Sequence, residues 1–166
     1  MEFLDYLWAY FIVFVFAAIP FFEAFGVITL GILAGLPAVP VILVSLVGNI
    51  LTVLLLIVFI NKFKEWRRKR KGEEAEKQQS KRAVRAQNLW NKFGMPGLAF
   101  IGPLFVGSHL TAFMCVTLGG QKKRTSIWMV SSITVWGIVF ALLTHFGVDF
   151  LGYEDRGVLK DLIQVD

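Results

Sequence analysis

The sequence predicts an all-α integral membrane protein built from two inverted repeats, each a re-entrant helical hairpin followed by a transmembrane helix. Of the 166 residues, 56% are hydrophobic and only 17% are charged, whereas soluble domains carry about 25% charged residues. The basic residues are segregated, because 12 of the 17 Lys and Arg side chains fall between Lys62 and Lys92. The long, nearly uncharged stretches on either side leave room for several bilayer-crossing segments, each of which needs about 20 apolar residues.

Prolines divide the first half, residues 1–61. Pro20 interrupts the first apolar stretch, which predicts a re-entrant hairpin at about residues 5–35 whose arms are each shorter than a full crossing. A glycine and two prolines near residue 37 end this hairpin. An uninterrupted spanning helix is predicted at about residues 41–61.

The second half, residues 94–148, repeats this pattern. A hairpin is predicted at about residues 95–120, with breaks in its middle at Gly102-Pro103 and at Gly107. A spanning helix is predicted at about residues 125–147. Glycines and prolines mark the opening, the middle and the end of the hairpin: Gly94, Pro96, Gly97, Gly102, Pro103, Gly107, Gly119 and Gly120. Residues 149–166 are predicted to form an acidic extramembrane tail.

Residues 62–93 are predicted to form a basic cytoplasmic loop. Apolar residues recur at helical spacing between Ala86 and Phe93, opposite Lys81 and Arg85. This spacing is typical of an amphipathic helix on an anionic membrane surface, and a solvated linker turn is the alternative.

Orientation follows from charge, because cytoplasmic loops are enriched in Lys and Arg. The chain is expected to cross a bacterial cytoplasmic (inner) membrane more than once. The loop and the cluster of Lys122, Lys123 and Arg124 are both placed on the cytoplasmic side of that membrane. The second hairpin must then return to the side from which it entered. The first half begins outside and the second inside, as in inverted-repeat transporters.

Glu23 is the only charged side chain between Asp5 and Lys62. A carboxylate in hydrocarbon costs about 2.5–3.5 kcal/mol on insertion scales, so acids within a membrane are functional candidates. Its place near the hairpin turn suits a proton-coupling acid or a cation ligand. The alternative is that Glu23 caps the helix that follows by accepting backbone N–H bonds.

The second hairpin offers polar residues just after Gly107. Ser108, His109 and Thr111 are predicted to face Glu23 if the two hairpin tips meet, so that His109 shares its proton or flanks a polar substrate. Thr29 and Asn49 are further candidates to line a cavity, or act as interhelical hydrogen-bonders. Lys122, Lys123 and Arg124 determine topology or hold a lipid phosphate.

Several function classes are excluded. The sequence has no Gly-rich loop followed by Lys-Ser/Thr, so ATP is not implied. No set of His, Cys and carboxylate residues has metal-ligand spacing, and the single cysteine, Cys115, reads as a packing residue. We expect no cofactor, no enzyme activity and no nucleic-acid partner.

Two segments resemble a known family. Glu23-Ala-Phe-Gly-Val-Ile-Thr-Leu-Gly-Ile-Leu-Ala-Gly-Leu36, followed by Val47-Gly48-Asn49, resembles the first half of the small multi-drug export protein family. Lys92-Phe-Gly-Met-Pro-Gly-Leu98 and Gly102-Pro-Leu-Phe-Val-Gly-Ser-His109 are similar to its second hairpin. That family is grouped with the DedA-like membrane proteins, whose fold is two opposed re-entrant hairpins. Phe25 and Thr29 differ from the Arg and Pro that relatives usually carry there.

The resemblance and the residues together give three hypotheses. The first is a secondary, proton-linked transporter of small molecules that uses Glu23, His109 and Ser108. The second, implied by the DedA-like resemblance, is a flippase for lipids of the undecaprenyl phosphate type. The third is a non-transporting membrane scaffold that binds lipid or protein partners through residues 62–92. Membrane lipids are expected partners, as is a homodimer that uses Gly48 or Gly137 for close helix approach.

Overall fold

The computed structural model describes residues 3–20, 22–71 and 81–150. The described residues form helices and connecting turns without strands, which confirms the all-α class. Most of the acidic tail and the middle of the basic loop lie outside the described residues. The helices are α1 (Phe3–Ala18), α2 (Ala24–Leu33), α3 (Ala38–Lys71), α4 (Lys81–Phe105), α5 (Ser108–Thr117) and α6 (Lys122–Phe150).

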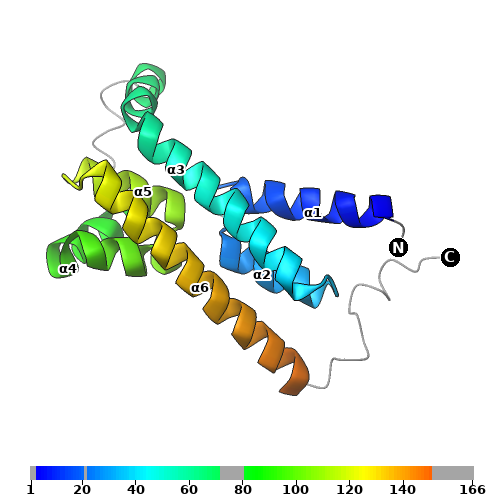
Figure 1. The fold of residues 1–166 in the computed structure, drawn as a ribbon. Helices are drawn as coiled ribbons and strands as arrows, with labels where there is room; N and C mark the ends of the chain where they lie inside the picture. Colours follow the sequence, from blue (N-terminus) through cyan, green and yellow to red (C-terminus); the bar gives the residue numbers. More distant parts are fainter. Residues whose placement is uncertain (1–2, 21, 72–80, 151–166) are drawn as a thin grey trace. The chain divides into compact units, whose positions relative to one another are not determined.

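The chain divides into two compact units. The first contains residues 1–49 and 133–166, and the second contains residues 50–132. Each unit holds one helix pair, α1 with α2 or α4 with α5, together with the beginning of the long helix that follows it and part of the other long helix. In the first unit α1 packs on α2, and in the second α4 and α5 lie side by side (Figure 1).

The first pair of short helices is delimited by residues that cannot continue a helix. Helix α1 ends shortly before Pro20, because proline lacks the N–H that a position inside a helix requires. The end of α2 is a Schellman motif: Leu36 N donates to Gly31 O (3.1 Å), and Gly35 N donates to Ile32 O (2.9 Å). Gly35 has φ 82°, a conformation that glycine adopts without steric cost.

The second pair ends in the same way. Gly120 N donates to Cys115 O (2.9 Å), Gly119 N donates to Val116 O (3.4 Å), and Gly119 has φ 106°. Helices α2 and α5 each contain 10 residues. Each begins after a residue with positive φ and extended ψ, which is Glu23 before α2 and Gly107 before α5. Glu23 and Gly107 are as far apart in the sequence as Ala38 and Lys122, the first residues of the two long helices. Local structure therefore repeats position by position from Glu23 into α3 and from Gly107 into α6.

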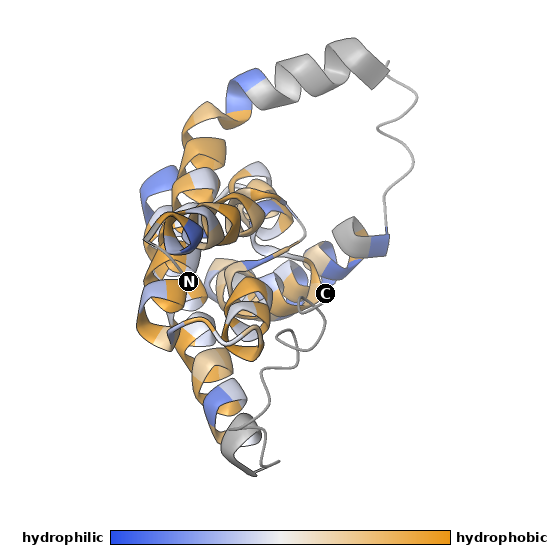
Figure 2. Cartoon of the chain, turned by 90° about the vertical axis from the view of Figure 1, so that its right-hand side faces the viewer, coloured by the Kyte–Doolittle hydropathy of each residue, from blue (hydrophilic) through white to orange (hydrophobic). Residues whose placement is uncertain are grey.

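The two long helices are long and apolar enough to cross a membrane over Ala38–Lys62 and Lys122–Gly147. Only 33% of the residues in an apolar 18-residue segment of each span are buried, whereas the core helix of a soluble protein is mostly buried. The uncovered side of α3 is an apolar stripe, and hydrophobic residues line most of the helix lengths in Figure 2. Such a surface fits lipid better than water. The stripe comprises Leu43, Val47, Leu51, Leu55 and Val58.

Both long helices exceed the predicted spans. Helix α3 begins at Ala38, because Pro40 falls in its first turn, where a missing N–H breaks no helical bond. It continues to Lys71, so the first part of the predicted loop is helical. Helix α6 begins at Lys122, which places the basic cluster in its first turn.

Glycines allow close helix contacts within the first unit. A Cβ atom on Gly48 would lie 2.8 Å from the backbone oxygen of Phe14 in α1, and one on Gly137 would lie 2.8 Å from Leu46 Cδ2. Both glycines predicted to support a homodimer therefore lie at contacts within a single chain. The homodimer itself stays a prediction.

Helix α4 contains the predicted amphipathic segment and continues beyond it. Gly94 (φ 66°, ψ −166°) kinks the helix where the second hairpin was predicted to open. The predicted break at Gly107 is confirmed, because the interruption falls at Val106 and Gly107. The second predicted break, at Gly102-Pro103, is wrong, because α4 continues to Phe105. Pro103 removes one backbone bond to the preceding turn, but it is fully buried near the end of the helix, where packing outweighs that loss.

Replacing Gly102 by alanine is expected to force α4 away from α5. The added Cβ would lie 2.6 Å from both Cγ2 and Oγ1 of Thr111. We expect the unfolding midpoint of the detergent-solubilised protein to fall by the equivalent of about 1–3 kcal/mol, the usual cost of overpacking. Gly26→Ala, with no atom within 4 Å of the new Cβ, is the matched control. Adding Thr111→Ala should recover most of the loss, and an unchanged midpoint in Gly102→Ala alone would contradict this contact.

Candidate functional site

Glu23 occupies the N-cap position of α2 in an unusual backbone conformation. Its φ is 37° and its ψ is 140°. Among the described residues other than glycine, Glu23 alone has a positive φ. Positive φ is uncommon outside glycine, and such strain tends to persist at functional sites. The side chain is 8% exposed and makes no capping hydrogen bond. The interpretation of Glu23 as a hydrogen-bonding cap is therefore wrong.

The Glu23 carboxylate instead faces α3. Asn49 Nδ2 donates to Glu23 Oε2 at 3.4 Å, and Asn49 is only 1% exposed. Asn49 is thus an interhelical hydrogen-bonder that holds the acid. Ser45 lies one turn earlier on the same face of α3 and is completely buried. Sequence reasoning did not select Ser45, although its four-residue spacing from Asn49 was the signal for it.

The positions that match Glu23, Ser45 and Asn49 in the repeated local structure hold no comparable polar group. Gly107 and Met129 of the second unit match Glu23 and Ser45, and Ile133, the first residue of the returning segment of the first unit, matches Asn49. Met129 and Ile133 are 0% and 2% exposed. The same local helix arrangement is therefore compatible with purely apolar side chains, so packing alone does not explain the polar set in the first unit.

Thr29 has a structural role beside this set. Its hydroxyl donates to Phe25 O (3.0 Å), and Thr144 Oγ1 of α6 lies 3.2 Å from it. One turn away, the ring centroids of Phe25 and Phe140 are 5.0 Å apart. These two contacts fix α2 against the end of α6, as expected of a threonine between helices.

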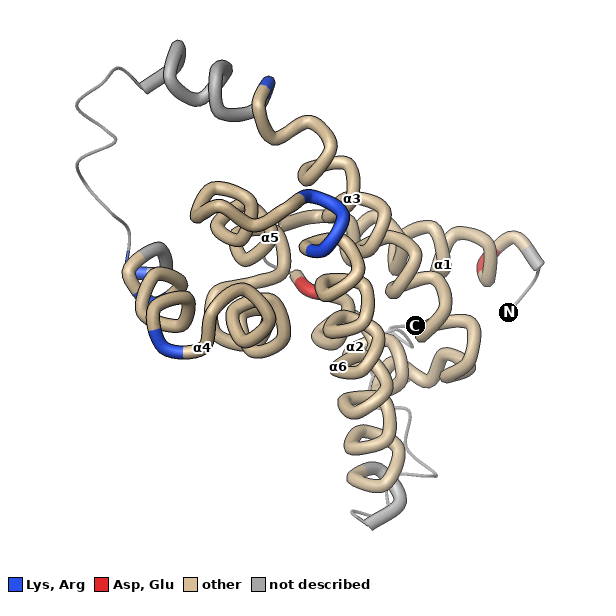
Figure 3. Tube along the Cα trace, turned by 60° about the vertical axis from the view of Figure 1, so that its left-hand side comes forward, with Lys and Arg blue, Asp and Glu red and all other residues tan. Residues whose placement is uncertain are grey.

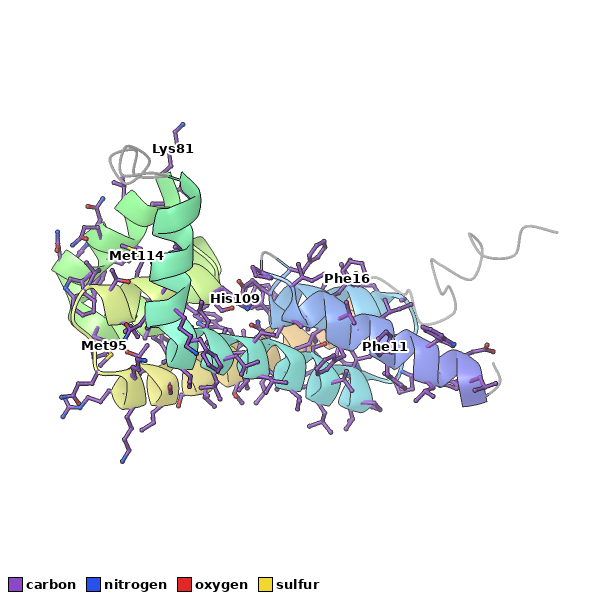
Figure 4. The ribbon with its side chains drawn as sticks, turned by 90° about the horizontal axis from the view of Figure 1, so that it is seen from above. Phe11, Phe16, Lys81, Met95, His109 and Met114 are labelled. Carbon is purple, nitrogen blue, oxygen red and sulfur yellow. The ribbon has the colours of Figure 1, made fainter. Side chains whose placement is uncertain are left out.

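His109 is the centre of a polar group in the second unit. Figure 4 labels His109 among the side chains of the structure. His109 Nε2 lies 3.0 Å from Thr52 Oγ1 of α3, and Ser108 Oγ lies 3.3 Å from His109 Nδ1. Sequence reasoning did not select Thr52, although it is the next polar residue along α3 after Asn49. Thr111 packs against Gly102, and its buried hydroxyl has no hydrogen-bond partner in the described protein. The predicted pairing of Glu23 with His109 joins residues of different units and stays a prediction.

A family model decides the identity. The model described as "Putative small multi-drug export protein" matches residues 23–139. The chain belongs to this family. No curated protein and no solved structure matches the chain.

For this export-family protein, the match begins at Glu23 itself and covers both helix pairs after that point. The family description names export rather than a catalysed reaction, which is consistent with a transporter. Together with the two long apolar helices, it indicates a membrane protein. The described residues contain no group of three or more His, Cys, Asp or Glu that would hold a metal ion.

The basic cluster of this family member lies at the beginning of α6 (Figure 3). Lys122 Nζ donates to Val58 O of α3 at 2.9 Å, and Lys123 and Arg124 are exposed. Cations in the first turn of a helix are disfavoured by the helix dipole. Helix stability therefore does not account for the cluster, which leaves topology and anion binding as its two interpretations.

Proposed function

We propose that the chain is a proton-linked secondary transporter that exports small molecules across the bacterial cytoplasmic membrane, with Glu23 as its proton-binding group. The family description supports export, and α3 and α6 supply helices able to cross a membrane. One observation carries the assignment to Glu23. A buried carboxylate, held in a backbone conformation that is rare for glutamate, faces an amide, whereas the matching positions Gly107 and Ile133 carry neither group.

The chemistry of such a group suits coupling. A carboxylate in hydrocarbon costs about 2.5–3.5 kcal/mol on insertion scales, and protonation removes that charge. The Asn49 amide supplies a donor to the ionised form. With one state favoured by the amide and the other by the apolar surroundings, Glu23 can take a proton from one side and release it to the other. In transport by alternating access, one fixed site binds its ligand from one side of the membrane and releases it to the other.

The repeated local structure supports two inverted halves within the membrane. Each helix pair precedes a long helix, and α3 lies between the two pairs in the sequence. If α3 crosses the membrane once, the two pairs enter from opposite sides as re-entrant hairpins. The positive-inside rule then places residues 62–93 and the Lys122 cluster in the cytoplasm.

Cysteine accessibility in intact cells tests this topology. Cys115 is first replaced by alanine, and single cysteines are placed at positions 2, 78, 121 and 153. We expect a membrane-impermeant maleimide to label positions 2 and 153 from outside, while positions 78 and 121 react only after the membrane is opened. Outside labelling of Gln121 with Gln78 protected would make residues 93–121 an ordinary span and remove the second hairpin.

Export is tested by ethidium accumulation in a bacterial strain that lacks its major efflux pumps. Energised cells that produce the protein should retain less ethidium than cells with an empty vector, and a protonophore should abolish the difference. Equal ethidium levels in both cell types, at matched protein production, would count against export of this compound class.

A lipid phosphate is the second candidate substrate. The exposed side chains of Lys123 and Arg124 at the beginning of α6 favour it, because helix N-termini and basic groups attract phosphate. It predicts movement of a fluorescent phosphate-bearing lipid between leaflets of liposomes that contain only this protein. It also predicts no protonophore-sensitive export of ethidium.

A further inference from the structure

Three buried oxygen-bearing side chains lie at the beginning of α2 and on one face of α3. Glu23, Asn49 and Ser45 are 8%, 1% and 0% exposed. Glu23 contacts Asn49, and farther along α2 a Cβ atom on Gly31 would lie 2.7 Å from Val41 Cγ1. Ser45 is midway along α3 between those two contacts, one helical turn from Asn49.

The Ser45 hydroxyl is the unexplained member of this set. Its Oγ is fully buried and has no hydrogen-bond partner in the described protein. Leaving a buried hydroxyl unsatisfied costs about 1–3 kcal/mol. The matching position in the second unit is Met129, also completely buried. Packing at this level of the helix therefore does not require a hydroxyl, and the oxygen of Ser45 is left available to a ligand.

The donor set specifies the class of ligand. A carboxylate, an amide oxygen and a hydroxyl are oxygen ligands of hard cations, and the Asn49 amide can present its oxygen instead of its nitrogen. One carboxylate balances one positive charge. A divalent cation usually draws on more acidic ligands, and the described residues offer no group of three or more His, Cys, Asp or Glu. The set therefore fits a small monovalent cation.

We propose that Glu23, Asn49 and Ser45 form a Na⁺ site. The inference rests on the proposed function, because it assigns a second coupling ion to the carboxylate that carries the proton. Interrupted helices of transporters bring main-chain carbonyl oxygens to such ions, and the interruption between α1 and α2 directly precedes Glu23.

The test measures unfolding of the purified full-length protein in detergent. NaCl is titrated against choline chloride at constant ionic strength, and the unfolding midpoint is recorded. A ligand that binds only the folded protein raises the midpoint in a saturable way. We expect this response in the natural protein, and an apparent Na⁺ affinity at least about tenfold weaker in Ser45→Ala, the lower end of losses at perturbed metal sites.

Thr125→Val is the matched control. Thr125 also carries a fully buried hydroxyl without a hydrogen-bond partner in the described protein, but it lies in the second unit. This variant should keep the Na⁺ response. Ser45→Ala is expected to fold, because removing an unsatisfied buried hydroxyl is neutral or stabilising. Equilibrium binding of radioactive ²²Na⁺ to both variants provides an independent second measurement.

Each outcome decides the proposal. A Na⁺ response lost in Ser45→Ala and in Glu23→Gln, but kept in Thr125→Val, supports the site. An absent Na⁺ response in the natural protein, or an equal Na⁺ response in Ser45→Ala, overturns the Na⁺ site. In that case proton-linked export through Glu23 still stands if Glu23→Gln abolishes ethidium export. A Ser45-dependent Na⁺ response together with unchanged export in Glu23→Gln would leave the ion site standing and remove the proposed function.

Discussion

Glu23→Gln is expected to abolish proton-linked export. Glutamine keeps the size and a hydrogen-bonding group at this position, but it cannot exchange a proton. Energetic coupling between two ligands of a protein is typically worth about 5–150-fold in affinity, so losing the proton site should reduce export to near the level of cells without the protein. The measurement is ethidium accumulation in energised cells, normalised to the amount of protein in the membrane.

Two further variants make this result specific. Glu23→Asp retains a titratable carboxyl and should keep part of the protonophore-sensitive export. Asp5→Asn removes the acid of α1, which is exposed and lies at the far end of that helix, and it should change nothing. Normal export by Glu23→Gln, or an equal loss in Asp5→Asn, would remove Glu23 from its proposed role.

Gly120→Ala is expected to cause a large loss of stability. The added Cβ would lie 2.5 Å from the backbone oxygen of Cys115, which accepts the Gly120 N–H in the motif that ends α5. Backbone atoms cannot rotate away as a side chain can, so the turn from α5 into α6 must open. We expect a loss of about 3 kcal/mol or more, the upper range for overpacking.

The comparison for this variant is Gly147→Ala in α6. A Cβ at Gly147 meets no atom within 4 Å. Gly147→Ala should leave the unfolding midpoint of the detergent-solubilised protein unchanged or slightly raised, because alanine favours helix over glycine. A Gly120→Ala protein with the same midpoint as Gly147→Ala would show that the turn accommodates a side chain.

The sequence was a good guide to where helices stop and a poorer guide to where they continue. Pro20, Gly35 and Gly119 were correctly expected to lie at interruptions, since a missing N–H or a positive φ acts locally. The continuation of α4 through Pro103 could not be predicted in this way. It depends on the packing of α4 against α5, which is a tertiary contact.

The candidate site was predictable in part for a similar reason. A lone carboxylate in an apolar stretch is visible in the sequence, and so is an asparagine in a spanning segment. Which helix faces the carboxylate is not visible, so the contact between Glu23 and Asn49 and the unsatisfied hydroxyl of Ser45 required the folded chain. The left-handed conformation of Glu23 was likewise hidden, because sequence patterns would have assigned such a position to glycine.

The most direct test of the account is ethidium transport by the purified protein in liposomes with an imposed pH gradient. The account predicts ethidium movement against its own gradient while the pH gradient lasts, collapse of that movement with a protonophore, and none with Glu23→Gln. Ethidium flux equal to that of protein-free liposomes, or flux that ignores the pH gradient, would contradict the claim that this chain is a proton-linked exporter.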